Sequence, residues 1–138
     1  MNHTDIPRLM PLLMGLMLAM MANCLVAAEV EGDRILGVWA VSGKPAIVTM
    51  VKTDSGYQGT ITSNSKKPET VGRVVFRDLQ FDAKTSKWTG SVYAMERQEW
   101  RDVEISMPAD SAFNMTVHVG LFSKSLEWQR IPSAAAAQ

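Results

Sequence analysis

From residue 35 onward, apolar and polar residues alternate in short stretches that are separated by turn residues. In residues 57–63, for example, Tyr57, Gly59 and Ile61 alternate with hydrophilic residues, as in a strand with one dry face. This region lacks the sustained apolar spacing of an amphipathic helix. The pattern therefore predicts eight strands, over residues 35–41, 46–52, 57–63, 73–81, 88–94, 99–107, 112–119 and 125–131.

The connections between these predicted strands are short, which favours an antiparallel meander. Closing such a meander removes its exposed edges, so the predicted fold is all-β, an eight-stranded antiparallel up-and-down barrel. In the fourth predicted strand, Val74 and Phe76 share one alternation, whereas Leu79 and Phe81 share the other. A β-bulge at Arg77–Asp78 would return both pairs to one face and would bend the strand.

Three residues near the two ends of the strand region predict how the barrel is closed. Gly37 and Trp39 stand in the first predicted strand, and Arg130 stands in the last. A guanidinium stacked on an indole contributes about 0.5–2 kcal/mol, and its N–H groups can satisfy nearby carbonyls. We therefore expect Gly37, Trp39 and Arg130 to form a structural plug at one end of the barrel.

The sequence before the predicted strands has the three-part pattern of a secretory signal peptide. A short polar stretch containing Arg8 precedes the apolar residues 9–22, and small residues at 26–28 provide a cleavage site. Residues 1–28 are thus predicted to be removed on export to the periplasm or the cell exterior. The predicted barrel domain is residues 29–132, and residues 133–138 form a small-residue tail that is expected to be disordered.

Two other interpretations of this leader fit the sequence less well than cleavage does. A retained membrane anchor is disfavoured because Pro11 and Asn23 interrupt an apolar stretch that is already short for a spanning helix. Lipidation of Cys24 requires a small preceding residue, and Asn23 fits that requirement poorly. Cleavage near Ala28 is preferred, and it leaves no membrane span.

Charge and cysteine content narrow the function classes. The chain carries 14 basic and 14 acidic residues, without a basic stripe, so nucleic acid is not expected as a partner. Its single cysteine, Cys24, lies in the leader. The exported domain therefore depends on its core instead of on disulfides.

The sequence contains no legible catalytic or metal-binding constellation. His118 is the sole histidine beyond the leader and stands on the polar side of its predicted strand, so a surface role is preferred over that of a metal ligand or general base. The charged residues of 96–104 are interpreted as a solvated face. We therefore expect a protein that is not an enzyme, with no metal site and no cofactor.

Nine residues are expected to face the barrel interior because they occupy the apolar positions of their strands. In a barrel of eight strands the same residues can fill a solid core or line a ligand cavity, and the pattern does not decide between the two. Among them Tyr57 would supply a polar group to a ligand. The nine candidate lining residues are Val48, Met50, Tyr57, Ile61, Val92, Val103, Ile105, Met115 and Val117.

Four short motifs occur in the order Ile35–Trp39, Lys87–Gly90, Val119–Phe122 and Trp128–Arg130. In this order they resemble the domain of unknown function 2147 family of small exported bacterial proteins. The resemblance runs from about Arg34 to Ile131 and implies a lipocalin-like barrel, but no settled activity. The chain departs from the family at residues 94–98, where members commonly carry an Asp-Pro-x-x-Gly turn.

Two functions follow as hypotheses. The first is a carrier or binder of a small apolar or amphipathic ligand, held in a hollow barrel. The second is a filled barrel that acts as a structural or interaction module and presents its surface to an envelope protein.

Overall fold

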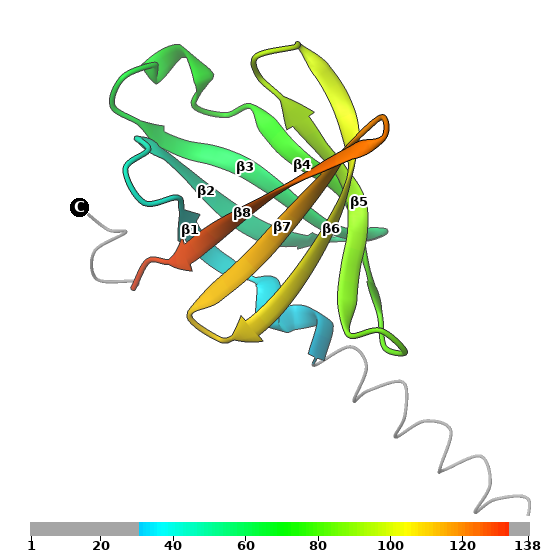
Figure 1. The fold of residues 1–138 in the computed structure, drawn as a ribbon. Helices are drawn as coiled ribbons and strands as arrows, with labels where there is room; N and C mark the ends of the chain where they lie inside the picture. Colours follow the sequence, from blue (N-terminus) through cyan, green and yellow to red (C-terminus); the bar gives the residue numbers. More distant parts are fainter. Residues whose placement is uncertain (1–30, 133–138) are drawn as a thin grey trace, which may run out of the picture. The chain divides into compact units, whose positions relative to one another are not determined.

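Eight strands pair in chain order, each antiparallel to the next, and β8 returns to pair with β1, which closes the barrel (Figure 1). The computed structural model describes residues 31–132. The predicted eight-stranded up-and-down barrel is confirmed. The strands are β1 (Gly37–Ala40), β2 (Ala46–Thr53), β3 (Gly56–Asn64), β4 (Val74–Asp82), β5 (Lys87–Ala94), β6 (Glu99–Ala109), β7 (Ala112–Val119) and β8 (Phe122–Arg130).

Several sequence predictions fall on residues outside this described part of the chain. These are the signal peptide at 1–28 with Cys24, the first two residues of the predicted domain 29–132, and the tail at 133–138. In the described residues, no helix is long and apolar enough to cross a membrane.

Most strand boundaries lie within one residue of the predicted ones, but two strands start two or three residues away from the predicted position. Strand β1 starts at Gly37 because the preceding residues form a 3₁₀ turn, η1 (Asp33–Ile35), in which the Leu36 amide donates to the Asp33 carbonyl. Strand β8 starts at Phe122, three residues earlier than predicted, because β7 and β8 form a tight hairpin in which Val119 faces Phe122. A second 3₁₀ turn, η2 (Pro68–Thr70), lies in the connection from β3 to β4.

The predicted bulge in β4 is present. Beyond Arg77, two residues of β4 oppose the single residue Gly90 of β5. Asp78, the first of these two residues, has φ of +54°, in the left-handed region. Because of the extra residue, Phe76 and Leu79 are both fully buried although they are three positions apart.

A second irregularity in β4 was not indicated by the sequence. Thr60 pairs with Val74 and Gly59 pairs with Phe76, so Val75 has no partner in β3. Val75 is nevertheless buried, because the irregular register turns it toward the interior.

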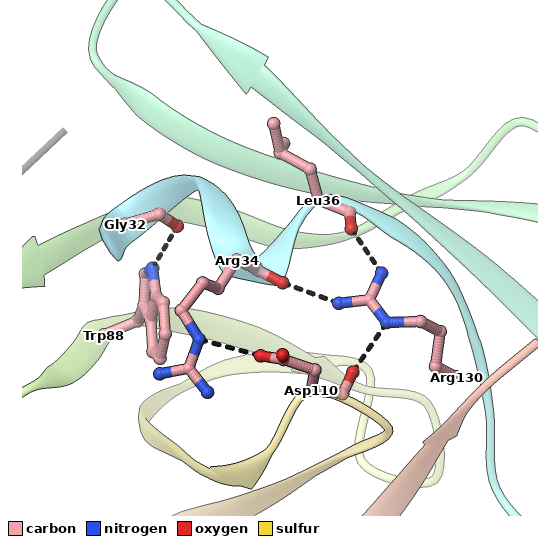
Figure 2. A network of polar contacts seen from close by, with 6 residues as sticks. All are labelled: Gly32, Arg34, Leu36, Trp88, Asp110 and Arg130. Carbon is pink, nitrogen blue, oxygen red and sulfur yellow. Dashed lines mark hydrogen bonds and ion pairs between the residues drawn. The ribbon is translucent and has the colours of Figure 1, made fainter. Parts of the chain in front are cut away.

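One end of the barrel is closed by Arg130, which joins the two ends of the barrel domain (Figure 2). Its Nη1 and Nη2 donate to the carbonyls of Leu36 and Arg34 at 2.7 and 2.6 Å, and its Nε donates to the Asp110 carbonyl at 2.7 Å. The guanidinium carbon lies 4.3 Å from the centre of the Trp39 ring. A single cation thus satisfies three carbonyls outside the strand ladders and covers an indole face.

The indoles beneath this closure are also fixed by backbone carbonyls. Trp39 Nε1 donates to the Ile35 carbonyl at 2.9 Å, and Trp88 Nε1 donates to the Gly32 carbonyl at 3.0 Å (Figure 2 shows the second bond). Gly37 allows the guanidinium to lie close, since a Cβ at this position would stand 2.4 Å from Arg130 Nη1. Gly37 also has φ of +130°, which L-residues rarely adopt.

Replacing Trp39 by alanine tests the closure. Trp39 is completely buried and is covered by Arg130, so Trp39→Ala is expected to lower the free energy of unfolding by about 3–5 kcal/mol through lost transfer energy and a cavity. Urea unfolding measures the change. Trp100→Ala is the control, because Trp100 is half-buried and stacks under Arg77 at 3.8 Å; its loss is expected to be smaller. Equal losses would contradict the special role of Trp39.

A substitution at Gly90 tests the bulge. A Cβ at Gly90 would lie 2.8 Å from the carbonyl oxygens of Arg77 and Asp78, and backbone atoms cannot yield as a flexible side chain does. Gly90→Ala is therefore expected to cost about 1–3 kcal/mol in unfolding free energy. Thr89→Ala, at the exposed neighbouring position, should change it much less. A Gly90 variant as stable as the parent would argue against the bulge geometry.

Candidate ligand-binding cavity

The barrel is filled at the closed end and hollow at the other. A cavity of about 460 Å³ occupies the half opposite η1 and opens between the turns that join β1 to β2, β5 to β6, and β7 to β8. Its volume falls within the range of small-molecule sites. The wall is mostly apolar, and its residues are Val41, Lys44, Ala46, Val48, Ile61, Val75, Phe76, Val92, Tyr93, Ala94, Met95, Glu96, Arg97, Arg101, Met115, Val117, Val119, Lys124, Ser125, Leu126 and Trp128.

The nine predicted lining residues divide between these two halves. Five of them line the cavity: Val48, Ile61, Val92, Met115 and Val117. The other four are buried in the barrel but do not line the cavity: Met50, Tyr57, Val103 and Ile105. The interior is thus solid in one half of the barrel and hollow in the other, according to position along the strands.

Tyr57 lies near the closed end, away from the cavity wall. Its hydroxyl donates to Asp33 Oδ1 at 2.7 Å, and Lys52 Nζ lies 3.2 Å from the same oxygen. The prediction that Tyr57 supplies a polar group to the cavity is therefore not matched by its position, because its hydroxyl is hydrogen-bonded to Asp33 in the 3₁₀ turn η1.

Two aromatic rings form the floor of the cavity. Phe76 and Trp128 line it, and both pack on the fully buried Phe113, with Trp128 stacked on Phe113 at 5.6 Å between ring centres. Trp128 Nε1 is buried and has no hydrogen-bond partner among the described residues. A buried donor without an acceptor costs about 1–3 kcal/mol.

The mouth of the cavity is strongly cationic. Lys44, Arg97, Arg101 and Lys124 belong to its lining, against the single carboxylate Glu96. Within residues 31–132, Lys44, Arg97 and Lys124 form no ion pair, although the chain as a whole carries equal numbers of basic and acidic residues. The positive charge is therefore concentrated around the opening, where it raises the local concentration of anions.

Arg101 is the most enclosed of these cations. Its side chain is 25 % exposed, and Nη2 pairs with Glu99, while its buried Nε has no hydrogen-bond partner in the described part of the chain. Arg101 lines the cavity because it shares the inward alternation of β6 with Val103 and Ile105. A partly exposed guanidinium at an apolar wall is suited to a carboxylate or phosphate oxygen.

The interpretation of residues 96–104 as one solvated face was therefore wrong in part. Asp102 and Glu104 do face outward, and Glu104 pairs with Lys87 at 2.9 Å, but Glu96 and Arg101 belong to the cavity mouth. The signal was available, since Arg101 is two residues from the inward Val103. This alternation was hard to recognise because a charged residue at an inward position near a barrel rim has the same sequence pattern as a residue on the solvent-exposed face.

His118 lies on the outer face of β7 and is exposed, as its alternation predicts. A shallow surface depression brings it near Asp78, Gln80 and Glu104. No group of three His, Cys, Asp or Glu side chains within residues 31–132 is arranged to hold a metal ion.

The barrel resembles a solved structure, protein HP1028 from Helicobacter pylori, which is described as belonging to the lipocalin family. The superposition has a TM-score of 0.57 at 14% sequence identity and covers 72% of this chain and 84% of that chain. At such identity the likeness shows the fold alone: the barrel is lipocalin-like. Neither the models of protein families nor the curated proteins contain a match to this chain.

A pH titration tests the Tyr57–Asp33 contact. The hydrogen bond from Tyr57 is the largest influence on the pKa of Asp33 and lowers it below the usual value; slight burial opposes this and Lys52 reinforces it. A carboxyl with a lowered pKa in the folded state stabilises the fold above its unfolded pKa, about 3.9, and loses that contribution as pH falls through the folded value. Asp33→Asn should therefore be less stable than the parent at pH 7, with the gap closing in acid.

Urea midpoints measured between pH 7 and pH 2 provide the readout for this titration. Tyr57→Phe should reproduce part of the effect because it removes the main cause of the lowered pKa. Asp54→Asn, which changes an exposed carboxylate at the β2–β3 turn, is the control and should leave the free energy of unfolding at pH 7 close to that of the parent. A constant gap between Asp33→Asn and the parent at every pH would contradict the linkage.

Proposed function

We propose that this protein is an exported, non-catalytic binder of a small amphipathic molecule, whose apolar part enters the cavity and whose anionic head stays at the mouth. The observation that carries the proposal is the combination of a hollow, apolar half-barrel with a cationic opening. The proposal includes membership of the domain of unknown function 2147 family, which the sequence motifs suggest. It also includes export, which is predicted from residues 1–28.

The shape and chemistry of the cavity support a ligand with two unlike ends. The inner wall is aliphatic and aromatic, from Val48 and Ile61 down to Phe76, and burying a hydrocarbon there gains about 25 cal/mol per Å² of apolar surface. The polar side chains are gathered at the opening. A molecule that is apolar throughout would place hydrocarbon against the partly exposed guanidinium of Arg101, whereas an anionic head would pair with it.

The filled-barrel alternative has less support. A solid interior would need side chains throughout, and the structure fills only the half in which Trp39, Trp88 and Phe113 pack together. Above the floor formed by Phe76 and Trp128, the open half keeps its volume because its strands carry mainly Val, Ala and Ile at inward positions.

Affinity for a matched pair of ligands tests the proposal. Laurate and lauryl alcohol share one hydrocarbon chain and differ in the head, so calorimetry of both at pH 7 separates the two parts of the site. We expect both to bind, and laurate to bind about tenfold more tightly because its carboxylate forms a charge-assisted hydrogen bond with Arg101.

Variants of two arginines sharpen this test. Arg101→Gln should bring the affinity for laurate close to that for the alcohol, whereas Arg77→Gln, an exposed cation stacked on Trp100, should change neither. Failure of both ligands to bind would contradict the proposed function. If the parent protein bound both ligands equally, binding of an apolar molecule in the cavity would stand, but the assignment of an anionic head group to the mouth would be contradicted.

A further inference from the structure

The β7–β8 hairpin presents two large apolar side chains to solvent at the mouth end of the barrel. Leu121 is 100% exposed and Phe122 is 80% exposed. They stand at a two-residue turn, in which Gly120 has φ of +61° and Val119 faces Phe122. Figure 1 shows this turn at the same end of the barrel as the β3–β4 and β5–β6 connections. Isolated exposed apolar residues are ordinary, but two adjacent ones at a protruding turn indicate a contact surface.

Cations surround this turn. Lys124 follows Phe122 by two residues in β8, and Lys44 and Arg97 lie on the neighbouring turns around the same opening. Exposed Lys66 adds to them from the β3–β4 connection. The acidic groups at this end, Glu69, Glu96 and Glu99, are fewer, so the mouth end has an excess of positive charge in a chain whose overall charge is balanced.

We propose that the mouth end docks on an anionic lipid bilayer, with Leu121 and Phe122 inserted among the head groups and acyl chains and with Lys44, Arg97 and Lys124 against the anionic heads. Apolar side chains flanked by basic residues are the chemistry of interfacial membrane binding, in which burial and attraction to anionic lipids act together. This inference goes beyond the proposed function and holds whatever the cavity contains.

A bilayer fits this surface better than a folded protein does. Leu121 and Phe122 project from a narrow turn and form a convex wedge, whereas a stable protein interface needs a broad complementary patch of about 800 Å² per partner. The other exposed apolar residues of the mouth end, Val71 and Met95, lie in different connections and are 48% and 38% exposed. A fluid bilayer accepts a wedge without a matching pocket.

Sedimentation of the full chain with lipid vesicles tests the docking. We expect binding to vesicles of phosphatidylglycerol and phosphatidylethanolamine, weaker binding to phosphatidylcholine alone, and a decrease with salt. The double variant Leu121→Ser/Phe122→Ser should lower the partition coefficient at least about tenfold. Val51→Ser, at an exposed apolar position on the outer face of β2, is the control and should bind as the parent does. Parent and variants share residues 1–30, so a difference in partition between them reports the substituted positions.

The depth of single positions provides a second readout. A tryptophan introduced by Phe122→Trp should be quenched by lipids brominated on their acyl chains, and one introduced by Val51→Trp should not. Unchanged partition of the double variant, or no quenching at position 122, would overturn the proposal. Analytical ultracentrifugation in lipid-free buffer gives a third outcome. If the double substitution abolishes self-association but leaves vesicle binding unchanged, the turn is an interface between two copies of the chain, and the proposal is overturned.

Discussion

The whole barrel depends on the placement of one guanidinium across one indole. Strands β1 and β8 share a short register in which Trp39 faces Arg130, so the seam alone contributes few ladder hydrogen bonds. Arg130 strengthens it by binding the carbonyls of Arg34 and Leu36 before β1 and of Asp110 beyond β6. These carbonyls lie outside the strand ladders, where an unpaired acceptor would be costly. The same side chain thus closes the sheet and covers the closed end of the core.

This closure explains why a cavity can exist in so small a domain. The described residues contain no cysteine, so no disulfide among them adds to the core and to the Arg130 closure. The closed half supplies a dense cluster in which Trp39 packs on Phe113 at 4.7 Å and the fully buried Phe76 adjoins the same ring at 6.4 Å. Large rings concentrated in one half allow the other half to remain open without losing the fold.

The sequence was sufficient for the architecture but only partly sufficient for the site. Alternation and turn residues predicted eight strands, and the change of alternation between Phe76 and Leu79 predicted the bulge, because both are local consequences of the two-residue period of a strand. The position of a residue along the barrel axis is not determined by the local sequence. It depends on stagger between strands, so Met50 and Val48 have equivalent patterns although only Val48 lines the cavity.

The polar members of the cavity were harder to recognise for a related reason. Tyr57 has the inward alternation, but its hydroxyl is used by Asp33, which lies 24 positions earlier, and such a contact is visible only after the chain is folded. Arg101 also has the inward alternation, yet its charge favoured an outward interpretation. A charged residue can occupy an inward position when it stands near an open rim, because the head reaches solvent while the stem covers apolar wall. Inward charge therefore indicates which end of a small barrel is open, and in this chain Arg101 marks the end opposite Arg130.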